Sequence, residues 1–250
     1  MNIIKKHWKN ASSLIMIAKD TLKNNKNWSA LLLERSSRSK FMPNAYVFPG
    51  GITEHSDYSK KWWKLFEKKG WTRKKLADIF FVKGERPPLI QDIDLEHDSM
   101  PPDIALRITA IREAFEEVGI LLHDGNKKLE NSDINFVKWR NYVYNDPHEF
   151  INLFEELDCL PNIWNLYEWS NWLTPSDFKP RRYDTMFYIY CCKDGIPVPI
   201  ACTKEVEYVQ VCRLCAVFIY FLDSHFISRN FYFVTCKQIL GVSDSPPSPM

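Results

Sequence analysis

The 250-residue chain has no large excess of either charge and no apolar run long enough to cross a bilayer. Its 33 basic and 31 acidic residues leave a net charge of +2, so no overall charge draws the protein to nucleic acid or to an anionic membrane. The longest apolar run near the C-terminus spans residues 214–222, whereas a membrane-spanning helix needs about 20 residues. We therefore expect any binding of a charged ligand to depend on a local group of side chains.

The chain also lacks the cysteine pattern of a small secreted protein, because its seven cysteines are odd in number. Cys212 and Cys215 form one CxxC pair, but no second pair or histidine pair follows at zinc-finger spacing. Reduced thiols without metal are the favoured interpretation. The first ten residues have no apolar core of a signal peptide, and no internal repeat is present. We expect one globular domain over residues 8–250.

Apolar and β-branched runs predict strands at residues 12–19, 30–35 and 181–192, and a short strand stopped by Pro49, Gly50 and Gly51. Residues 52–103 differ from their surroundings, because a segment rich in lysine and tryptophan gives way to an acidic, proline-rich loop. We interpret them as a helical insertion. Its aromatic side chains either cap the core, which is the favoured interpretation, or form a lid that faces phosphate or RNA.

Residues 102–122 follow the period of a helix with two unlike faces. At about 100° per residue, Glu116 and Glu117 fall within roughly 60° of Glu113. The apolar positions on the opposite side are Ile104, Ile108, Ile111, Phe115 and Val118. One face is therefore predicted to be core and the other to be carboxylate.

Three glutamates on one face repel each other, so a cation should accompany them. In one interpretation the face is solvated and Arg112 pairs with Glu116 at i+4. In the other, a divalent cation is held by Glu113, Glu116 and Glu117, because Mg²⁺ prefers a few carboxylates together with substrate phosphates. A metal there would polarise phosphoryl oxygens, and a carboxylate would orient or deprotonate water. The chemistry predicted by the second interpretation is hydrolysis of a phosphoanhydride.

The segment "REAFEEVGI", residues 112–120, resembles the second half of the Nudix box, G-x5-E-x7-R-E-U-x-E-E-x-G-U. The resemblance to the Nudix hydrolase superfamily implies an α/β fold, an α/β/α sandwich around a mixed sheet. It also implies that Glu116 and Glu117 bind Mg²⁺ or Mn²⁺, that Glu113 is a metal ligand or base, and that Arg112 orients a glutamate.

The first half of the box departs from the pattern, because 60 residues separate Gly51 from Arg112. This is about 47 more than in an uninterrupted box, so we expect the insertion at residues 52–103 to lie inside the motif. Counted back from Arg112, the early glutamate of the box falls at Ile104. Asp103 is one position away and is a weak substitute.

The segments "VFPGG", "ALRITAIREAFEEVGILL" and "RRYDTMFYIY" resemble, in this order, the peroxisomal acyl-coenzyme A diphosphatase branch of the superfamily. The resemblance implies hydrolysis of coenzyme A and acyl-coenzyme A to 3′,5′-ADP and (acyl-)4′-phosphopantetheine. Residues 31–51 also resemble the pattern L-L-T-x-R-[SA]-x3-R-x3-G-x3-F-P-G-G of coenzyme A-cleaving Nudix enzymes, with Leu33, Lys40 and Asn44 as replacements. The predicted substrate-binding residues are Arg35, Arg38, Lys40, Gly50, Gly51 and Arg182. Arg182 has an internal ion pair as its equal alternative.

Two other functions stay open from the sequence. One is hydrolysis of another nucleotide diphosphate or of capped RNA, and the other is an inactive coenzyme A-binding variant. The second arises because residues 211–250 do not resemble the branch, and we expect this tail to pack poorly. The resemblance implies a peroxisomal or mitochondrial location, but residues 248–250 are not a targeting tripeptide, which leaves a cytoplasmic location as the alternative. No membrane partner is expected, and the oligomeric state is not predicted.

Overall fold

Strand β1 (Lys9–Lys19) lies at the centre of a mixed sheet. The structure, a computed structural model, describes residues 8–19, 28–37, 45–80, 85–91, 98–125, 135–177, 181–200 and 206–214. Within these residues the remaining strands are β2 (Trp28–Arg35), β3 (Tyr46–Val47), β4 (Gly50–Ile52), β5 (Tyr167–Leu173), β6 (Tyr183–Cys192) and β7 (Val206–Leu214). Their order is β3-β2-β1-β6-β5, with β4 also on β1 and β7 also on β2.

Strands β1 and β6 run parallel, from Lys9 opposite Tyr183 to Ala18 opposite Cys192. The other pairs are antiparallel. Both faces of β1 are apolar, because Leu14 and Met16 join the main core while Ile15 and Ile17 join a second cluster on the other face. A central strand covered on both faces reads as a continuous apolar run, which is why residues 12–19 were recognisable in the sequence.

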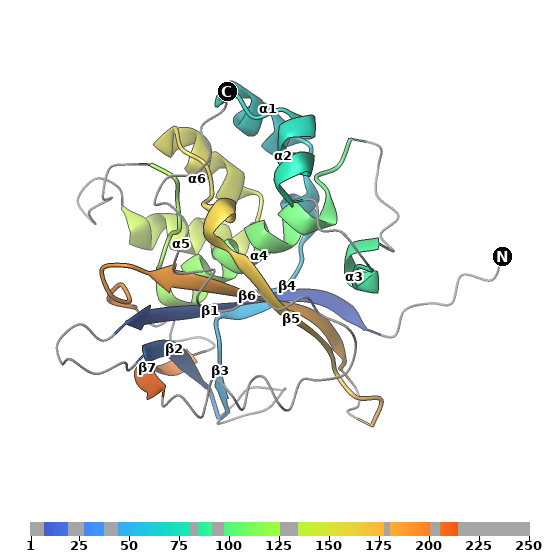
Figure 1. Cartoon of the computed structure of the whole chain (residues 1–250). Coiled ribbons are helices and arrows are strands. Elements are labelled where there is room, and N and C mark those ends of the chain that lie inside the picture. The colour runs from blue at the N-terminus through green and yellow to red at the C-terminus, as the bar shows by residue number, and fades with distance from the viewer. Residues whose placement is uncertain are drawn as a thin grey trace.

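The helices lie on one side of this sheet, with α4 (Pro102–Val118) nearest to it (Figure 1). The others are α1 (Lys61–Lys68), α2 (Arg73–Phe80), α3 (Pro88–Gln91), α5 (Phe136–Asn145) and α6 (Glu149–Leu157), with short 3-10 helices η1 (His55–Tyr58) and η2 (Ile163–Asn165). The predicted mixed α/β fold is confirmed. A second helical layer on the opposite face is not among the described residues. Over the same residues, no helix is long and apolar enough to span a membrane.

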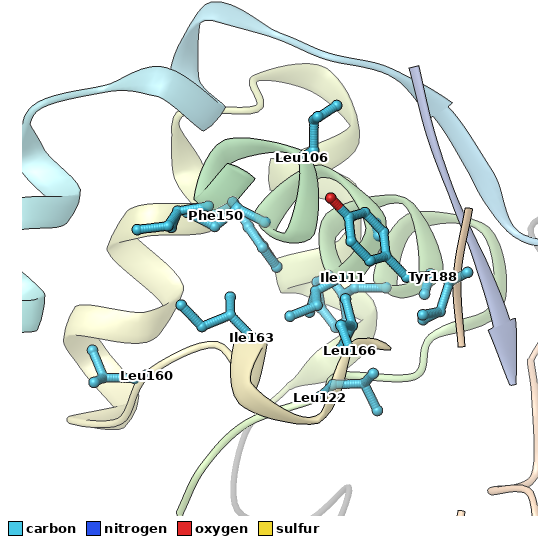
Figure 2. Packing of buried hydrophobic residues seen from close by; sticks show 14 of the residues in the cluster. Leu106, Ile111, Leu122, Phe150, Leu160, Ile163, Leu166 and Tyr188 are labelled. Atoms are coloured by element: carbon cyan, nitrogen blue, oxygen red, sulfur yellow. The ribbon is translucent and has the colours of Figure 1, made fainter. Parts of the chain in front are cut away.

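Helix α4 begins after Pro101, with a proline in its first turn, and ends where Gly119 adopts a left-handed backbone with φ of 70°. All five apolar positions predicted for its core face are buried. Figure 2 shows Leu106 and Ile111 of this helix among Phe150, Ile163 and Tyr188. On the opposite face Glu117 is buried, and the side chains of Glu113 and Glu116 are only 14% and 12% exposed, which contradicts the interpretation of a solvated carboxylate face.

The aromatic side chains of the predicted insertion point into the core. Trp62, Trp63 and Trp71 are buried, and the Trp62 ring meets Phe150 and Phe154 edge-on at centroid distances of 6.2 and 6.0 Å. The lysines of α1 remain exposed. This arrangement matches the favoured interpretation of an aromatic cap, because rings held in the core cannot stack on nucleic-acid bases.

The predicted divergent tail, residues 211–250, begins inside β7. This strand pairs with β2 from Arg35 opposite Val206 to Trp28 opposite Leu214. Residues from 215 onward, which include Cys215 of the CxxC pair, lie outside the described part of the chain. The expectation that the tail packs poorly stays a prediction.

Candidate active site

The C-terminal half of α4 places two of the predicted glutamates against the glycine turn that forms β4. The Gly50 N–H donates to Glu117 Oε2 at 2.9 Å. A Cβ added to Gly51 would lie 2.5 Å from Cδ of Glu113, a separation that real Cβ atoms do not show. Glycine at position 51 therefore lets the Glu113 carboxylate approach the backbone of β4. The two halves of the motif, which are far apart in sequence, meet here.

Arg112 lies beneath the carboxylates with only 2% of its side chain exposed. Its Nη1 donates to Glu113 Oε1 at 2.9 Å and to Glu116 Oε1 at 2.8 Å. Its Nη2 also donates to the carbonyl of Ile52 at 3.0 Å. The predicted pair between Arg112 and Glu116 is present, but it is one part of a buried network.

A further carboxylate, Asp57 of η1, completes this network. Arg112 Nε donates to Asp57 Oδ1 at 2.9 Å and Nη2 donates to Oδ2 at 3.0 Å, a bidentate contact. The same carboxylate accepts two further hydrogen bonds, one from Thr109 Oγ1 at 2.7 Å and one from the Glu54 N–H at 3.0 Å. We call Asp57, Arg112, Glu113 and Glu116 the acidic cluster.

Asp57 is the residue that the sequence reasoning missed. It lies six positions after Gly51, which is where the G-x5-E half of the Nudix pattern has its glutamate. Counting forward from Gly51 would have found it, whereas counting back from Arg112 led to Asp103. The structure instead pairs Asp103 with Arg86 at the other end of α4 and buries Ile104 in the core. The insertion therefore interrupts the box after its early acidic position.

The acidic cluster holds more negative than positive charge, because three carboxylates share one guanidinium. Burial raises the pKa of Glu113, the charge of Arg112 lowers it, and the charges of Glu116 and Asp57 raise it again, to about 7. Burial is the largest of these causes, and the single charge of Arg112 does not offset it. The carboxylate oxygens of the cluster are the kind of ligand that a hard cation prefers.

The oxygen donors and the surplus charge fit a hard divalent cation. Glu113, Glu116 and Glu117 are the side chains that could hold it, while Asp57 is occupied by Arg112 and Thr109. Among the described residues, no three Asp, Glu, His or Cys side chains are already gathered as a metal-binding group. Glu113 and Glu116 now accept from Arg112, and Glu117 accepts from Gly50.

The remaining predicted residues divide into three groups. Arg35 ends β2, and its N–H donates to the carbonyl of Ala45 at 3.0 Å, just ahead of the glycine turn. Arg38 and Lys40 lie outside the described residues. Arg182 donates from Nε to the carbonyl of Thr174 at 2.9 Å and lies 5.5 Å over the ring of Trp8. These contacts of Arg182 belong to the edge of the sheet and not to the acidic cluster.

A second charged group, at the N-terminal end of α4, joins the insertion to the sheet. We call Arg86, Asp103, Arg107 and Glu168 the balanced cluster, because it has two guanidiniums and two carboxylates. Arg86 donates to Glu168 through two nitrogens, each at 2.7 Å, and Arg107 donates to Glu168 Oε1 at 3.0 Å. Burial raises the pKa of Glu168, but the hydrogen bonds from Arg86 and the charge of Arg107 outweigh it and lower that pKa to about 2.

Comparison with known proteins gives results of two kinds. The sequence profile of the NUDT19 Nudix domain matches residues 8–227. Curated relatives named acyl-coenzyme A diphosphatase NUDT19 are 38% identical in Xenopus laevis over 82% of this chain, and 32% identical in Gallus gallus over 97% of it. The chain spans 62% of the length of the first relative and 77% of the second.

A solved structure, a NUDIX hydrolase from Alicyclobacillus acidocaldarius, matches with a TM-score of 0.56 at 20% identity. The match covers 82% of this chain and 78% of that one. At this identity the likeness concerns the fold alone. It agrees with the mixed α/β fold described above.

Proposed function

The chain belongs to the NUDT19 Nudix domain family, and from this premise we propose that it hydrolyses the diphosphate of coenzyme A and acyl-coenzyme A to 3′,5′-ADP and (acyl-)4′-phosphopantetheine. The names of the Xenopus and Gallus relatives support this substrate class. The observation that carries the proposal is the acidic cluster together with Glu117, because Glu113 lies against Gly51 and Glu117 accepts from the Gly50 N–H in the glycine turn of β4. Such a cluster suits a reaction at a phosphoanhydride.

Nudix hydrolases generally use divalent metals, and we propose Mg²⁺ or Mn²⁺ for this chain, held by Glu113, Glu116 and Glu117. When bound, the metal would polarise phosphoryl oxygens and lower the pKa of a coordinated water. Arg112 orients the carboxylates of Glu113 and Glu116 through its Nη1. The Gly50 N–H fixes Oε2 of Glu117.

In the alternative in which Glu116 and Glu117 hold the metal, Glu113 is the candidate general base. Burial raises the pKa of its carboxyl group in the metal-free site, which strengthens it as a proton acceptor. Oε1 accepts from Arg112, which leaves Oε2 as the oxygen to receive a proton from water. Arg112 cannot be the base, because a guanidinium stays protonated in proteins.

For substrate binding we propose Arg35, Arg38, Lys40, Gly50 and Gly51. Cations just before the glycine turn would contact the diphosphate and the 3′-phosphate of coenzyme A. Arg35 supports this assignment, because its backbone pairs with Ala45 at the start of that turn. A peroxisomal location rests on the resemblance to the enzyme branch, and microscopy of the tagged protein beside a peroxisomal marker would test it. The tryptophans of the insertion are in the core, so the capped-RNA alternative now depends on the exposed lysines of α1.

The test is product analysis after incubation of the protein with coenzyme A and Mg²⁺ or Mn²⁺. We expect 3′,5′-ADP and 4′-phosphopantetheine by chromatography. Glu117→Gln keeps an acceptor for the Gly50 N–H and removes the charge. It should lower turnover by at least about 100-fold, because even the outer partners of metal ligands typically contribute 10- to 100-fold.

Glu156→Gln, on the exposed side of α6, is the matched control and should retain full activity. Folded wild-type protein that makes no 3′,5′-ADP with either metal would contradict the proposal. Calorimetric binding of coenzyme A without products would then identify the inactive binding variant. Faster turnover of capped RNA than of coenzyme A would favour the alternative substrate.

A further inference from the structure

Glu116 and Glu117 lie in the last turn of α4, which is an electrostatically unfavourable place for carboxylates. The last carbonyls of a helix have no partner inside the helix, and they carry the negative end of its dipole. Two acidic side chains add to that negative potential. A helix that presents carboxylates at this end therefore needs a positive group from elsewhere in the fold.

Arg140 of α5 supplies such a group. Its Nε donates to the backbone carbonyl of Glu116 at 3.1 Å and its Nη2 donates to the same oxygen at 2.9 Å. The regular helical partner of this carbonyl would be the N–H of Ile120, but the chain has already left the helix at Gly119. The guanidinium thus takes the place of the missing backbone donor.

Gly119 leaves the space that this contact requires. A Cβ at position 119 would lie 3.3 Å from Nη1 of Arg140, tighter than most real contacts. The same glycine has a φ of 70°, which ends α4. The end of the helix and the arrival of the Arg140 guanidinium are therefore coupled at one residue.

Glu116 is consequently held by two arginines. Arg112 Nη1 donates to its carboxylate at 2.8 Å, and Arg140 donates to its carbonyl. We propose that Arg140 is a positioning residue for the metal site, which fixes the backbone of Glu116 through its two hydrogen bonds to the Glu116 carbonyl. This inference rests on the proposed function, because it assumes that Glu116 holds the metal.

Titration of the metal-free, full-length protein with Mn²⁺, followed by the electron paramagnetic resonance signal of free Mn²⁺, tests the role without any turnover. Arg140→Met should weaken Mn²⁺ binding by about 10- to 100-fold, the usual effect of losing an outer partner of a metal ligand. Arg140→Lys should fall between this variant and wild type, since lysine can still donate to the Glu116 carbonyl but lacks the planar fork with two donors.

Lys138→Met is the matched control, because it removes a cation from the same helix at an exposed position over the ring of Tyr142. It should bind Mn²⁺ as wild type does. With saturating Mn²⁺, the KM for coenzyme A should be unchanged in Arg140→Met, while the Mn²⁺ concentration for half-maximal rate rises. A residue that only stabilises the fold would lower the melting temperature and leave both metal readouts unchanged.

Wild-type Mn²⁺ affinity in Arg140→Met, or an equal loss in Lys138→Met, overturns the positioning role. If Arg140→Met does not fold, Arg140→Lys decides, and wild-type affinity in that variant overturns the role. Wild-type protein that binds no Mn²⁺ overturns the role together with the metal assignment. Loss of Mn²⁺ binding in Arg140→Met, in a wild type that binds Mn²⁺ but does not cleave coenzyme A, supports the positioning role while the proposed substrate fails.

Discussion

The two ends of helix α4 carry buried charged clusters that differ in their balance of charge. In the balanced cluster at the N-terminal end, two guanidiniums meet two carboxylates. In the acidic cluster at the C-terminal end, one guanidinium meets three carboxylates. The pKa of Glu168 in the first is lowered to about 2, while the pKa of Glu113 in the second is raised to about 7.

The proposed function gives the balanced cluster a structural role and the acidic cluster a metal-binding role on the same helix. The charges of the balanced cluster neutralise one another, and its ion pairs link Arg86, which precedes α3, to α4 and β5. In the acidic cluster carboxylates outnumber guanidiniums, and Arg140 adds a cation beside it through its contact with the Glu116 carbonyl. Surplus charge of this kind is retained at sites that bind a cation or move protons. The following predictions test whether stability and activity divide between the clusters in this way.

The largest effect on stability is expected from Glu168→Gln in the balanced cluster. It would leave the buried Arg107 and the partly buried Arg86 with one carboxylate, Asp103, between them. Breaking a buried ion pair typically costs about 3–5 kcal/mol, and urea unfolding would measure this loss. Glu156→Gln should change the free energy of unfolding by less than about 0.5 kcal/mol. An equally stable Glu168→Gln protein would show that the cluster is not structural.

The acidic cluster should make the free energy of unfolding depend on pH, with a sign opposite to that expected for Glu168. The ordinary pKa of glutamate is 4.5, and that of Glu113 is about 7 when folded. Between these values the folded state keeps a proton that the unfolded chain loses, so the free energy of unfolding should fall as pH rises, by about 3 kcal/mol. Urea unfolding of metal-free protein at pH 5 and pH 7.5 would measure it.

Glu113→Gln should flatten this profile, because glutamine does not titrate. The contribution of Glu168 runs the other way. Its folded pKa of about 2 lies below the ordinary 4.5, so its stabilisation is present above pH 4.5 and is lost as pH falls toward 2. A Glu113→Gln protein with the wild-type slope between pH 5 and 7.5 would assign the effect to another group.

Gly51→Ala should affect activity more than stability. The added Cβ meets the carboxylate of Glu113, which is the far end of a flexible side chain. Displacing that carboxylate should lower kcat/KM for coenzyme A by about 10-fold or more. Gly50→Ala is the contrasting variant, because its Cβ would lie 2.5 Å from the backbone oxygen of Ser12. It should lower stability first. A lower melting temperature for Gly51→Ala than for Gly50→Ala would contradict this assignment.

The smallest effect is expected for charges outside both clusters. Lys64 is exposed on α1, and Lys64→Gln should change the free energy of unfolding by less than about 0.5 kcal/mol. Turnover of coenzyme A and its dependence on salt should also be unchanged. A marked loss of turnover in Lys64→Gln would show that charged side chains of the insertion also contribute to activity.

Local patterns in the sequence predicted the central strand, the two faces of α4 and the glycine turn beside it. Each of these depends on periodicity or on residue type within one short segment. The balanced cluster could not be predicted, because Arg86 and Glu168 are 82 positions apart. Asp57 was missed because counting back from Arg112 assumes that the insertion precedes the early acidic position, whereas it follows that position. Arg140 gave no signal, since its partner is a backbone carbonyl.

The position of the insertion has a consequence for how the motif should be recognised. The N–H of Met100 donates to the carbonyl of Tyr58 at 2.9 Å, so the chain returns after α3 to the point from which it left. Asp57 and Arg112 are therefore in contact although the insertion separates them in sequence. An uninterrupted motif with a short connection before the helix would bring them together in the same way. The signature is continuous in space although it is interrupted along the chain, and a three-dimensional template of four side chains would recover it at any length of insertion.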